Sequence, residues 1–205
     1  MNFIGKWTLE NKEVCDDLIN FFENSSFAKE NKKKGKVGEA SSFAKENKKE
    51  GVINEEIKKS TDLIIKPSNY DIIEIQNYLE ELQKVCMKYV KKYQWCDRFS
   101  PWYIAEGFNI QHYEPEGGYY AWHSERVSAE FPVGTRHLVF MTYLNDVTDC
   151  GETEWFYQKT KIKPKKGLTA IWPADWTHVH RGIASPTQHK YIATGWYNYC
   201  LPKTN

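Results

Sequence analysis

Residues 191–199 have the sequence YIATGWYNY, a run of aromatic and β-branched side chains of the kind that favours β-strands. Further runs of similar character lie in the second half of the chain, at residues 108–112, 119–123, 136–145, 153–157, 168–172 and 179–184. Pro and Gly turn signals separate them, at residues 115–118, 149–151, 164–167 and 186. Many short strands at regular spacing predict a sandwich or barrel, and a double-sheet jelly roll is one such arrangement.

The first hundred residues are polar and rich in Lys and Glu, with apolar residues at helical spacing. One short amphipathic helix is predicted from Val14, Leu18, Ile19 and Phe22. A longer helix is predicted over residues 69–92, with Asp71 capping or charging its first turn. We therefore expect an α+β protein, in which a helical support region (residues 1–100) and a core (residues 101–205) form one integrated domain.

A short repeat interrupts the helical region. The sequence SSFAKENKK occurs at residues 25–33 and returns unchanged at residues 41–49. The unit is too short for a solenoid, and two copies are too few to stack. We interpret it as a tandem duplication within a polar surface insertion, at about residues 24–60, because surface loops absorb insertions readily. A docking arm for an acidic partner is the alternative.

Composition limits the classes of function. A chain of 205 residues fits one domain, and its net charge of +1 gives no strong attraction for nucleic acid or an anionic membrane. No apolar run approaches the roughly 20 residues that span a bilayer, and no signal-peptide pattern opens the sequence. The cysteines are odd in number and lack metal-site spacing: Cys15, Cys86, Cys96, Cys150 and Cys200. These features predict free thiols and a reducing, cytoplasmic location.

The strongest chemical signal is a candidate metal site. His123 and Glu125 are two residues apart, so on a strand both side chains face the same side. His180 lies on a later predicted strand. Two imidazoles and one carboxylate form the ligand face that binds Fe(II) and leaves other positions open. His178 is an alternative to His180 as the distal ligand, and zinc is an alternative metal because it also accepts His and Glu.

Around this site, short motifs follow one another in a specific order. They are Tyr113, Gly117-Gly118-Tyr119, His123-Ser124-Glu125, Arg136 to Asn145, Gly151-Glu152-Thr153, Lys165-Lys166-Gly167, His180-Arg181-Gly182 and Lys190 to Trp196. This order resembles the prolyl 4-hydroxylase branch of the Fe(II)/2-oxoglutarate-dependent dioxygenases, over about half of the chain. The resemblance implies a double-stranded β-helix (jelly-roll) core with flanking N-terminal helices.

The resemblance also implies cofactors and residue roles. Its cofactors are Fe(II), the cosubstrate 2-oxoglutarate and O2, with ascorbate as a candidate reductant. The residues that match iron ligands are His123, Glu125 and His180. Those that match contacts to 2-oxoglutarate are Lys190, Tyr143 and Tyr113. Those that match contacts to substrate are Arg136, Tyr120 and Trp196.

A cation inside the barrel is also required on physical grounds. A dicarboxylate cannot enter an apolar interior unless a fixed opposite charge offsets its desolvation. Lys190 lies in an aromatic and β-branched strand, where a barrel interior would present it. Arg181 is a competing cation for the same role.

Glu125 departs from the family's pattern, because most members carry Asp at this position. Glutamate is one methylene longer, so its carboxylate must fold back or the iron must shift. Both residue types bind divalent metals, so the prediction of a metal site is kept. The longer side chain predicts a ligand geometry that differs from that of the family.

The resulting function hypothesis is hydroxylation of a C–H bond, with release of succinate and CO2. The expected substrate is a prolyl residue in a peptide or protein, as for procollagen-proline 4-dioxygenase, with residues 127–135 as a lid over the groove. An extended proline-rich segment suits an aromatic-lined groove. Alternatives are a free amino acid, a small molecule or a nucleobase as substrate, and a non-catalytic jelly-roll binding module.

Overall fold

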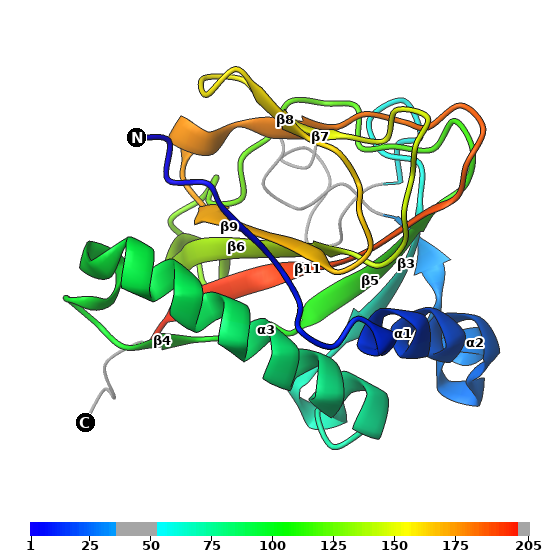
Figure 1. Cartoon of the computed structure of the whole chain (residues 1–205), viewed down its shortest axis with the longest axis horizontal. Helices are drawn as coiled ribbons and strands as arrows, with labels where there is room; N and C mark the ends of the chain where they lie inside the picture. The colour runs from blue at the N-terminus through cyan, green and yellow to red at the C-terminus, as the bar shows by residue number, and fades with distance from the viewer. Residues whose placement is uncertain (36–52, 201–205) are drawn as a thin grey trace.

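The computed structural model describes residues 1–35 and 53–200, in which two β-sheets face each other and helices cover one of them (Figure 1). The major sheet has the order β1-β9-β6-β11-β5-β3-β2, with β4 paired to β11, and the minor sheet has the order β10-β7-β8. The strands are β1 (Gly5–Thr8), β2 (Lys33–Lys34), β3 (Thr61–Ile65), β4 (Trp102–Tyr103), β5 (Phe108–Tyr113), β6 (Arg136–Tyr143), β7 (Thr153–Trp155), β8 (Thr160–Ile162), β9 (Leu168–Pro173), β10 (His180–Gly182) and β11 (Lys190–Tyr199). The helices are α1 (Glu13–Asn24), α2 (Ser26–Asn31) and α3 (Ile73–Lys92), with 3-10 turns at Pro67–Asn69, Gln94–Asp97, Val133–Thr135 and Trp176–His178. The predicted α+β jelly roll is confirmed.

The strand β11 divides the interior into two cores. It pairs with β5 and β6, so that Lys190 lies opposite Tyr113 and Ile192 lies opposite Tyr143. Because successive side chains point to opposite faces, these four residues share the face between the sheets. The neighbouring residue Tyr191 points to the other face, which packs against the helices. One strand therefore presents polar chemistry to the barrel interior and apolar area to the helical layer.

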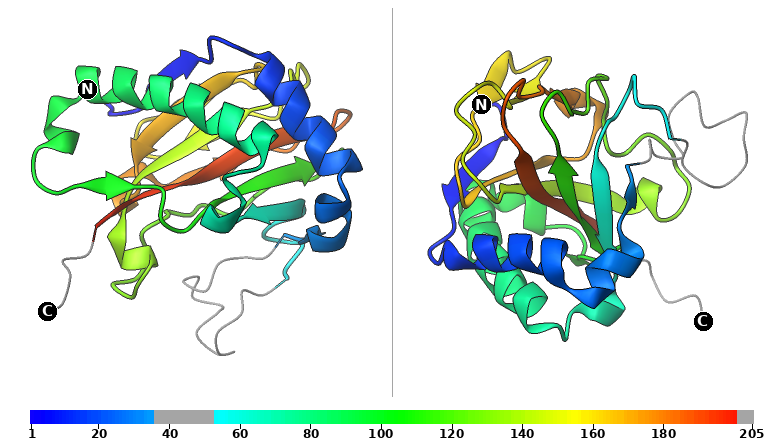
Figure 2. Two further views of the ribbon diagram at one scale, coloured as in Figure 1. Left: turned by 90° about the horizontal axis from the view of Figure 1, so that it is seen from below. Right: turned by 90° about the vertical axis from the view of Figure 1, so that its right-hand side faces the viewer.

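The helical layer packs against the outer face of the major sheet (Figure 2). In α1 the predicted apolar face is buried, including Leu18 and Phe22. In α3 the buried positions recur at helical spacing and include Tyr78, Leu82, Val85 and Tyr89. Both predicted helices are confirmed.

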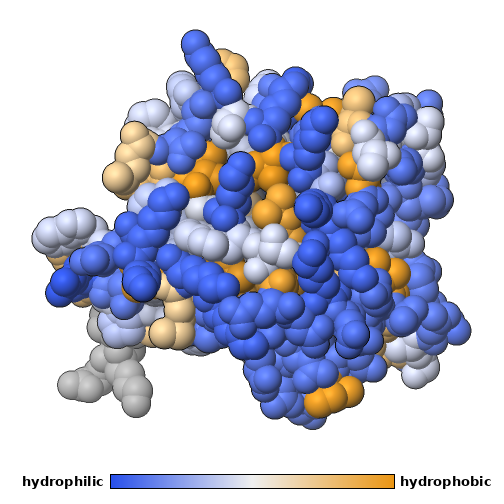
Figure 3. Space-filling model, in the orientation of Figure 1, coloured by the Kyte–Doolittle hydropathy of each residue, from blue (hydrophilic) through white to orange (hydrophobic). Residues whose placement is uncertain are grey.

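The face of the molecule shown in Figure 3 is largely hydrophilic, with separate hydrophobic patches.

The start of α3 differs from the prediction. The helix begins at Ile73 after Ile72, and the acidic residue in its first turn is Glu74 rather than Asp71. The prediction of Asp71 as a cap was wrong because Pro67–Asn69 forms a separate 3-10 turn, which delays the helix. The long helix therefore occupies fewer residues than its apolar spacing suggested.

The first hundred residues contribute strands as well as helices. Strand β1 pairs with β9 at one side of the major sheet, and β3 pairs with β5 near the other. The predicted strand at residues 119–123 forms only two isolated bridges, Lys58 to Tyr119 and His123 to His180. That prediction was wrong because the two ends of the segment pair with different partners, so no continuous ladder forms.

Of the two copies of the repeat, only the first, at residues 25–33, lies within the described residues. In the first copy, Ser25 caps the N-terminus of α2, where its side chain accepts a hydrogen bond from the amide of Ala28. The second copy lies outside the described residues. All five cysteines are free, as predicted. Within residues 1–35 and 53–200, no helix is both long and apolar enough to cross a membrane.

Candidate active site

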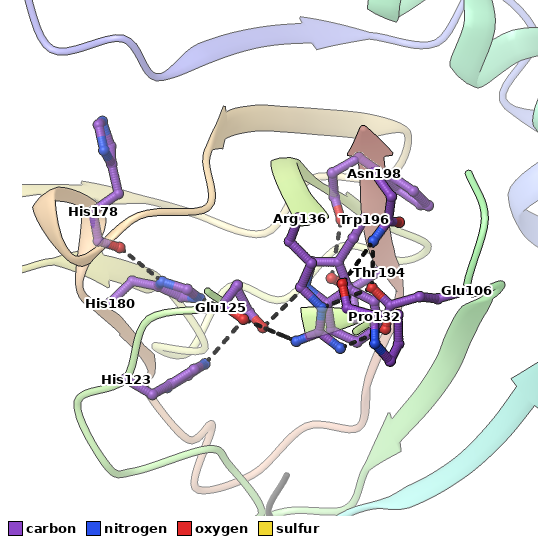
Figure 4. A network of polar contacts seen from close by, with 11 residues as sticks. Glu106, His123, Glu125, Pro132, Arg136, His178, His180, Thr194, Trp196 and Asn198 are labelled. Atoms are coloured by element: carbon purple, nitrogen blue, oxygen red, sulfur yellow. Dashed lines mark hydrogen bonds and ion pairs between the residues drawn. The ribbon is translucent and has the colours of Figure 1, made fainter. Parts of the chain in front are cut away.

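Three side chains from two distant parts of the sequence converge between the two sheets (Figure 4). The backbone of His123 bridges to that of His180 on β10, and Glu125 follows His123 by two residues. The donor atoms of these three residues all lie within 4.8 Å of one another. Glu125 Oε1 lies 3.5 Å from His123 Nε2 and 3.3 Å from His180 Nε2. A single carboxylate oxygen therefore shares one small volume with two imidazole nitrogens, a donor set that fits Fe(II) or zinc.

The outer nitrogens of both imidazoles are held by the backbone. His123 Nδ1 lies 2.9 Å from the carbonyl of Ala121, and His180 Nδ1 lies 3.0 Å from the carbonyl of His178. A carbonyl partner requires an N–H at Nδ1, which leaves a lone pair at Nε2 for a metal. The ring of Tyr119 stacks on that of His123 at a centroid distance of 3.7 Å. Both rings are therefore oriented before any metal arrives.

The structure also separates His178 from His180. The His178 ring bonds the backbone carbonyl of Asn2 through Nε2, and its side chain points away from Glu125 (Figure 4). Among the described residues, His123, Glu125 and His180 form the one such cluster of potential metal ligands. The geometry favours His180 over His178 as the distal ligand.

The charge states of the cluster suit a metal site. Burial alone would raise the pKa of the Glu125 carboxyl, but the adjacent His123 and His180 imidazoles hold that pKa well below its usual value. Burial, together with the nearby His123, lowers the pKa of His180. At neutral pH Glu125 is therefore ionised and His180 is neutral, the protonation states that metal binding requires.

Lys190 is a buried cation with no anionic partner among the described residues. Only 4% of its surface is exposed, and its Nζ donates hydrogen bonds to the carbonyls of Gly151 and Ile183 at 3.2 and 3.1 Å. It lies 4.8 Å above the centre of the Tyr113 ring. Burial lowers the pKa of Lys190 to about 8. A buried ammonium of this kind is costly on its own, so this position favours an anionic ligand.

Of the predicted cosubstrate tyrosines, Tyr113 faces Lys190 and Tyr143 lies opposite Ile192 on the neighbouring strand, and both hydroxyls already have protein partners. The Tyr143 hydroxyl lies 2.7 Å from Thr153 Oγ1 and 3.0 Å from the carbonyl of Ile162. The Tyr113 hydroxyl donates to Gln111 Oε1 at 2.7 Å, while the Tyr113 ring faces Lys190. Both tyrosines therefore line the same part of the interior.

The predicted substrate residues divide into two groups. Arg136 and Trp196 meet beside Glu125, with the guanidinium carbon 3.6 Å from the centre of a Trp196 ring. Tyr120 lies apart from them, and its hydroxyl donates to the backbone carbonyl of Glu116. The structure thus brings Arg136 and Trp196 to the cluster but leaves Tyr120 on a neighbouring turn.

Arg181, the alternative cation for the cosubstrate, already has an acidic partner. It pairs with Glu154 and lies over the Trp122 ring, 4.5 Å from its centre. Because His180 faces the interior, the next residue along the strand points outward. This geometry favours Lys190 over Arg181 as the cation for the cosubstrate.

Two residues at the site were not singled out by the sequence analysis. Tyr119 was part of a motif but had no assigned role, although its ring covers His123. Glu106 forms a two-pronged ion pair with Arg136, with distances of 2.9 and 2.7 Å. No periodicity marks Glu106, because it lies in the loop between β4 and β5.

Comparison with known proteins decides the family of the core. Residues 108–198 match the family model of the 2OG-Fe(II) oxygenase superfamily. This segment is a 2OG-Fe(II) oxygenase domain. It contains the whole His123, Glu125 and His180 cluster as well as Lys190, and this family implies Fe(II), 2-oxoglutarate and O2 as cofactor and cosubstrates. No curated protein sequence matches the chain significantly.

Solved structures similar to this oxygenase domain and its helices include three prolyl hydroxylases. The viral collagen prolyl hydroxylase of Paramecium bursaria Chlorella virus-1, in complex with 2OG, is 20% identical, with a TM-score of 0.63 and coverage of 97% of each chain. The Pseudomonas putida prolyl-4-hydroxylase is 13% identical, with a TM-score of 0.67 and coverage of 97% of this chain and 94% of that one. The Trichoplax adhaerens prolyl hydroxylase, in complex with a hypoxia inducible factor peptide fragment, is 15% identical, with a TM-score of 0.70 and coverage of 97% and 84%. At these identities, the likeness establishes the shared fold.

Proposed function

We propose that this oxygenase domain is a peptidyl-proline hydroxylase that uses Fe(II) and 2-oxoglutarate and releases succinate and CO2. The observation that carries the proposal is that one barrel interior contains both a potential metal site and a buried cation without an anionic partner among the described residues. A two-imidazole, one-carboxylate cluster stands at one point of the interior, and the buried ammonium of Lys190 lies on a strand of the same interior face. The cluster provides ligands for a metal ion, and the ammonium provides a positive charge for a dicarboxylate.

Each residue has a defined task in this proposal. His123, Glu125 and His180 would hold Fe(II), which together with 2-oxoglutarate supplies the activation of O2 for hydroxylation. Lys190 would bind the distal carboxylate of 2-oxoglutarate, exchanging its two backbone carbonyl partners for a full negative charge. The aromatic interior around Tyr113 and Tyr143 would exclude water, which strengthens that ion pair.

The prolyl substrate is supported by the surroundings of the cluster and by the relatives. The segment 126–135 leads from Glu125 to β6 and carries Phe131, which is 68% exposed. We propose that residues 127–135 form the lid over a peptide groove. The structures from Chlorella virus and Trichoplax are named for collagen and for a peptide fragment, which supports a peptide over a free amino acid.

The test is a coupled assay with purified protein, Fe(II), 2-oxoglutarate and ascorbate. We expect succinate to form with a proline-rich peptide and the peptide to gain the mass of one oxygen atom. A matched peptide with alanine in place of proline should not gain this mass, and His123→Ala should remove succinate formation. Succinate formation without any proline-dependent product would contradict the substrate, and no succinate with any additive would contradict the reaction.

A further inference from the structure

Glu125 uses its two oxygens differently. Oε1 faces both imidazoles, at 3.5 and 3.3 Å from their Nε2 atoms. Oε2 accepts a hydrogen bond from the indole Nε1 of Trp196 at 3.0 Å and lies 3.8 Å from Arg136 Nη1. The carboxylate therefore offers one oxygen to the metal position, while the other is turned toward Trp196 on β11 (Figure 4).

Arg136 strengthens this arrangement from two sides. Its Nη1 donates to the backbone carbonyl of Glu125 at 2.9 Å, and its guanidinium covers the Trp196 ring. The guanidinium is itself fixed by the Glu106 carboxylate, which also accepts from Asn198 Nδ2 at 2.7 Å. Glu106 thus holds Arg136, and Arg136 covers the Trp196 ring beside Glu125.

The length of the glutamate side chain matters to this contact. An aspartate on the same backbone would place its carboxylate about one C–C bond, or ~1.5 Å, closer to its own Cα. A carboxylate that still reached the metal position would then lose the hydrogen bond to Trp196, since such bonds fail beyond about 3.5 Å. The hydrogen bond from the Trp196 indole therefore depends on the extra methylene of Glu125.

We propose that Trp196 and Arg136 are positioning residues that clamp the outer oxygen and backbone of Glu125, so that this longer side chain presents a single oxygen to the metal. The inference rests on the proposed metal role of the cluster, and it gives Arg136 and Trp196 a task besides contact with substrate. Hydrogen-bond partners of metal ligands typically change metal affinity by roughly 10- to 100-fold when removed.

The test is a double-mutant cycle with Co(II) alone as the probe and its dissociation constant as the readout. In the natural background, Trp196→Phe should weaken Co(II) binding by roughly tenfold, because it removes the N–H but keeps an aromatic ring for Arg136. In the Glu125→Asp background, the same change should alter affinity by less than about twofold, because the shorter carboxylate does not reach the indole.

Trp102→Phe is the matched control. The Trp102 indole N–H is buried without a partner among the described residues, and its ring contacts His137 and Tyr197. This variant should bind Co(II) like the natural protein, and thermal unfolding of all variants checks that they fold.

Each outcome separates the clamp from the proposed function. Equal Co(II) affinity in the natural protein and Trp196→Phe would overturn the clamp and leave the metal site intact. Equal losses in the natural and Glu125→Asp backgrounds would also overturn it, because Trp196 would then act without the longer carboxylate. No Co(II) binding by the natural protein, or binding that His123→Ala does not change, would overturn the metal site and the clamp together.

Discussion

Lys190 gives the site a property that pH can reveal. Its ammonium lies in the barrel interior without a carboxylate partner among the described residues, and burial lowers its pKa to about 8. Below this pKa the cation is present to receive a dicarboxylate. Above this pKa, Lys190 of the free protein is neutral, and its amine must take up a proton before it can pair with the dicarboxylate.

We therefore predict that affinity for 2-oxoglutarate falls as pH rises above about 8, by up to about tenfold per pH unit, until the pKa of the bound complex is reached. Lys190→Arg is the control, since arginine stays charged throughout this range. Binding can be followed by equilibrium titration between about pH 6 and about pH 10. An affinity of the natural protein that stays constant across this range would contradict the assignment.

The sequence spacing singled out the three ligands, although His123 and Glu125 lie in no continuous strand and His123 meets His180 through one isolated bridge. It could not assign the partners of Glu125. The indole of Trp196 is 71 residues away along the chain, and the contact depends on the register of β11 against β6. The choice between His178 and His180 depended in the same way on the backbone turn that directs His178 to Asn2.

Helix α3 supports the site from behind the major sheet. Its buried face packs against the outward side of β5, β6 and β11, whose other side holds Lys190 and the tyrosines. Apolar periodicity was enough to predict α1 and α3. It could not predict β1, because the four-residue segment Gly5–Thr8 alternates too briefly to be distinguished from a loop.

The contribution of α3 can be measured with a matched pair of substitutions. Leu82 is 1% exposed, whereas Met87 on the same helix is 64% exposed. Leu82→Ala should lower the free energy of unfolding by about 2–5 kcal/mol, because it leaves a cavity in the core. Met87→Ala should change it by less than about 0.5 kcal/mol. Similar losses for the two variants in chemical denaturation would contradict the packing of this helix.

The whole molecule joins its first hundred residues to the oxygenase domain through a shared sheet. Strands β1 and β3 lie in the same sheet as β6 and β11, and α1 and α3 complete the core beneath it. Composition suggested two halves of different character, but strand pairing depends on contacts between residues far apart in the sequence. The sequence analysis expected one integrated domain, but it could not show that the first hundred residues supply strands of the major sheet.

We propose that the chain unfolds as one cooperative unit. Far-UV circular dichroism follows the helices, and tryptophan fluorescence follows the aromatic interior that includes Trp155 and Trp172. The two signals should give coincident denaturation curves. Two separated transitions would instead show that the helical region and the barrel fold independently.

The central claim is that one interior holds both Fe(II) and 2-oxoglutarate. The most direct measurement is an anaerobic titration of the natural protein with Fe(II) and 2-oxoglutarate, followed by the visible charge-transfer absorption of an iron-bound 2-oxo acid. The band should appear only when both are present and should be lost in His180→Ala. In Lys190→Met it should require roughly 100-fold more 2-oxoglutarate, with Lys161→Met, at an exposed lysine on β8, as the unaffected control. No band in the natural protein, or an equal band in His180→Ala, would contradict the account.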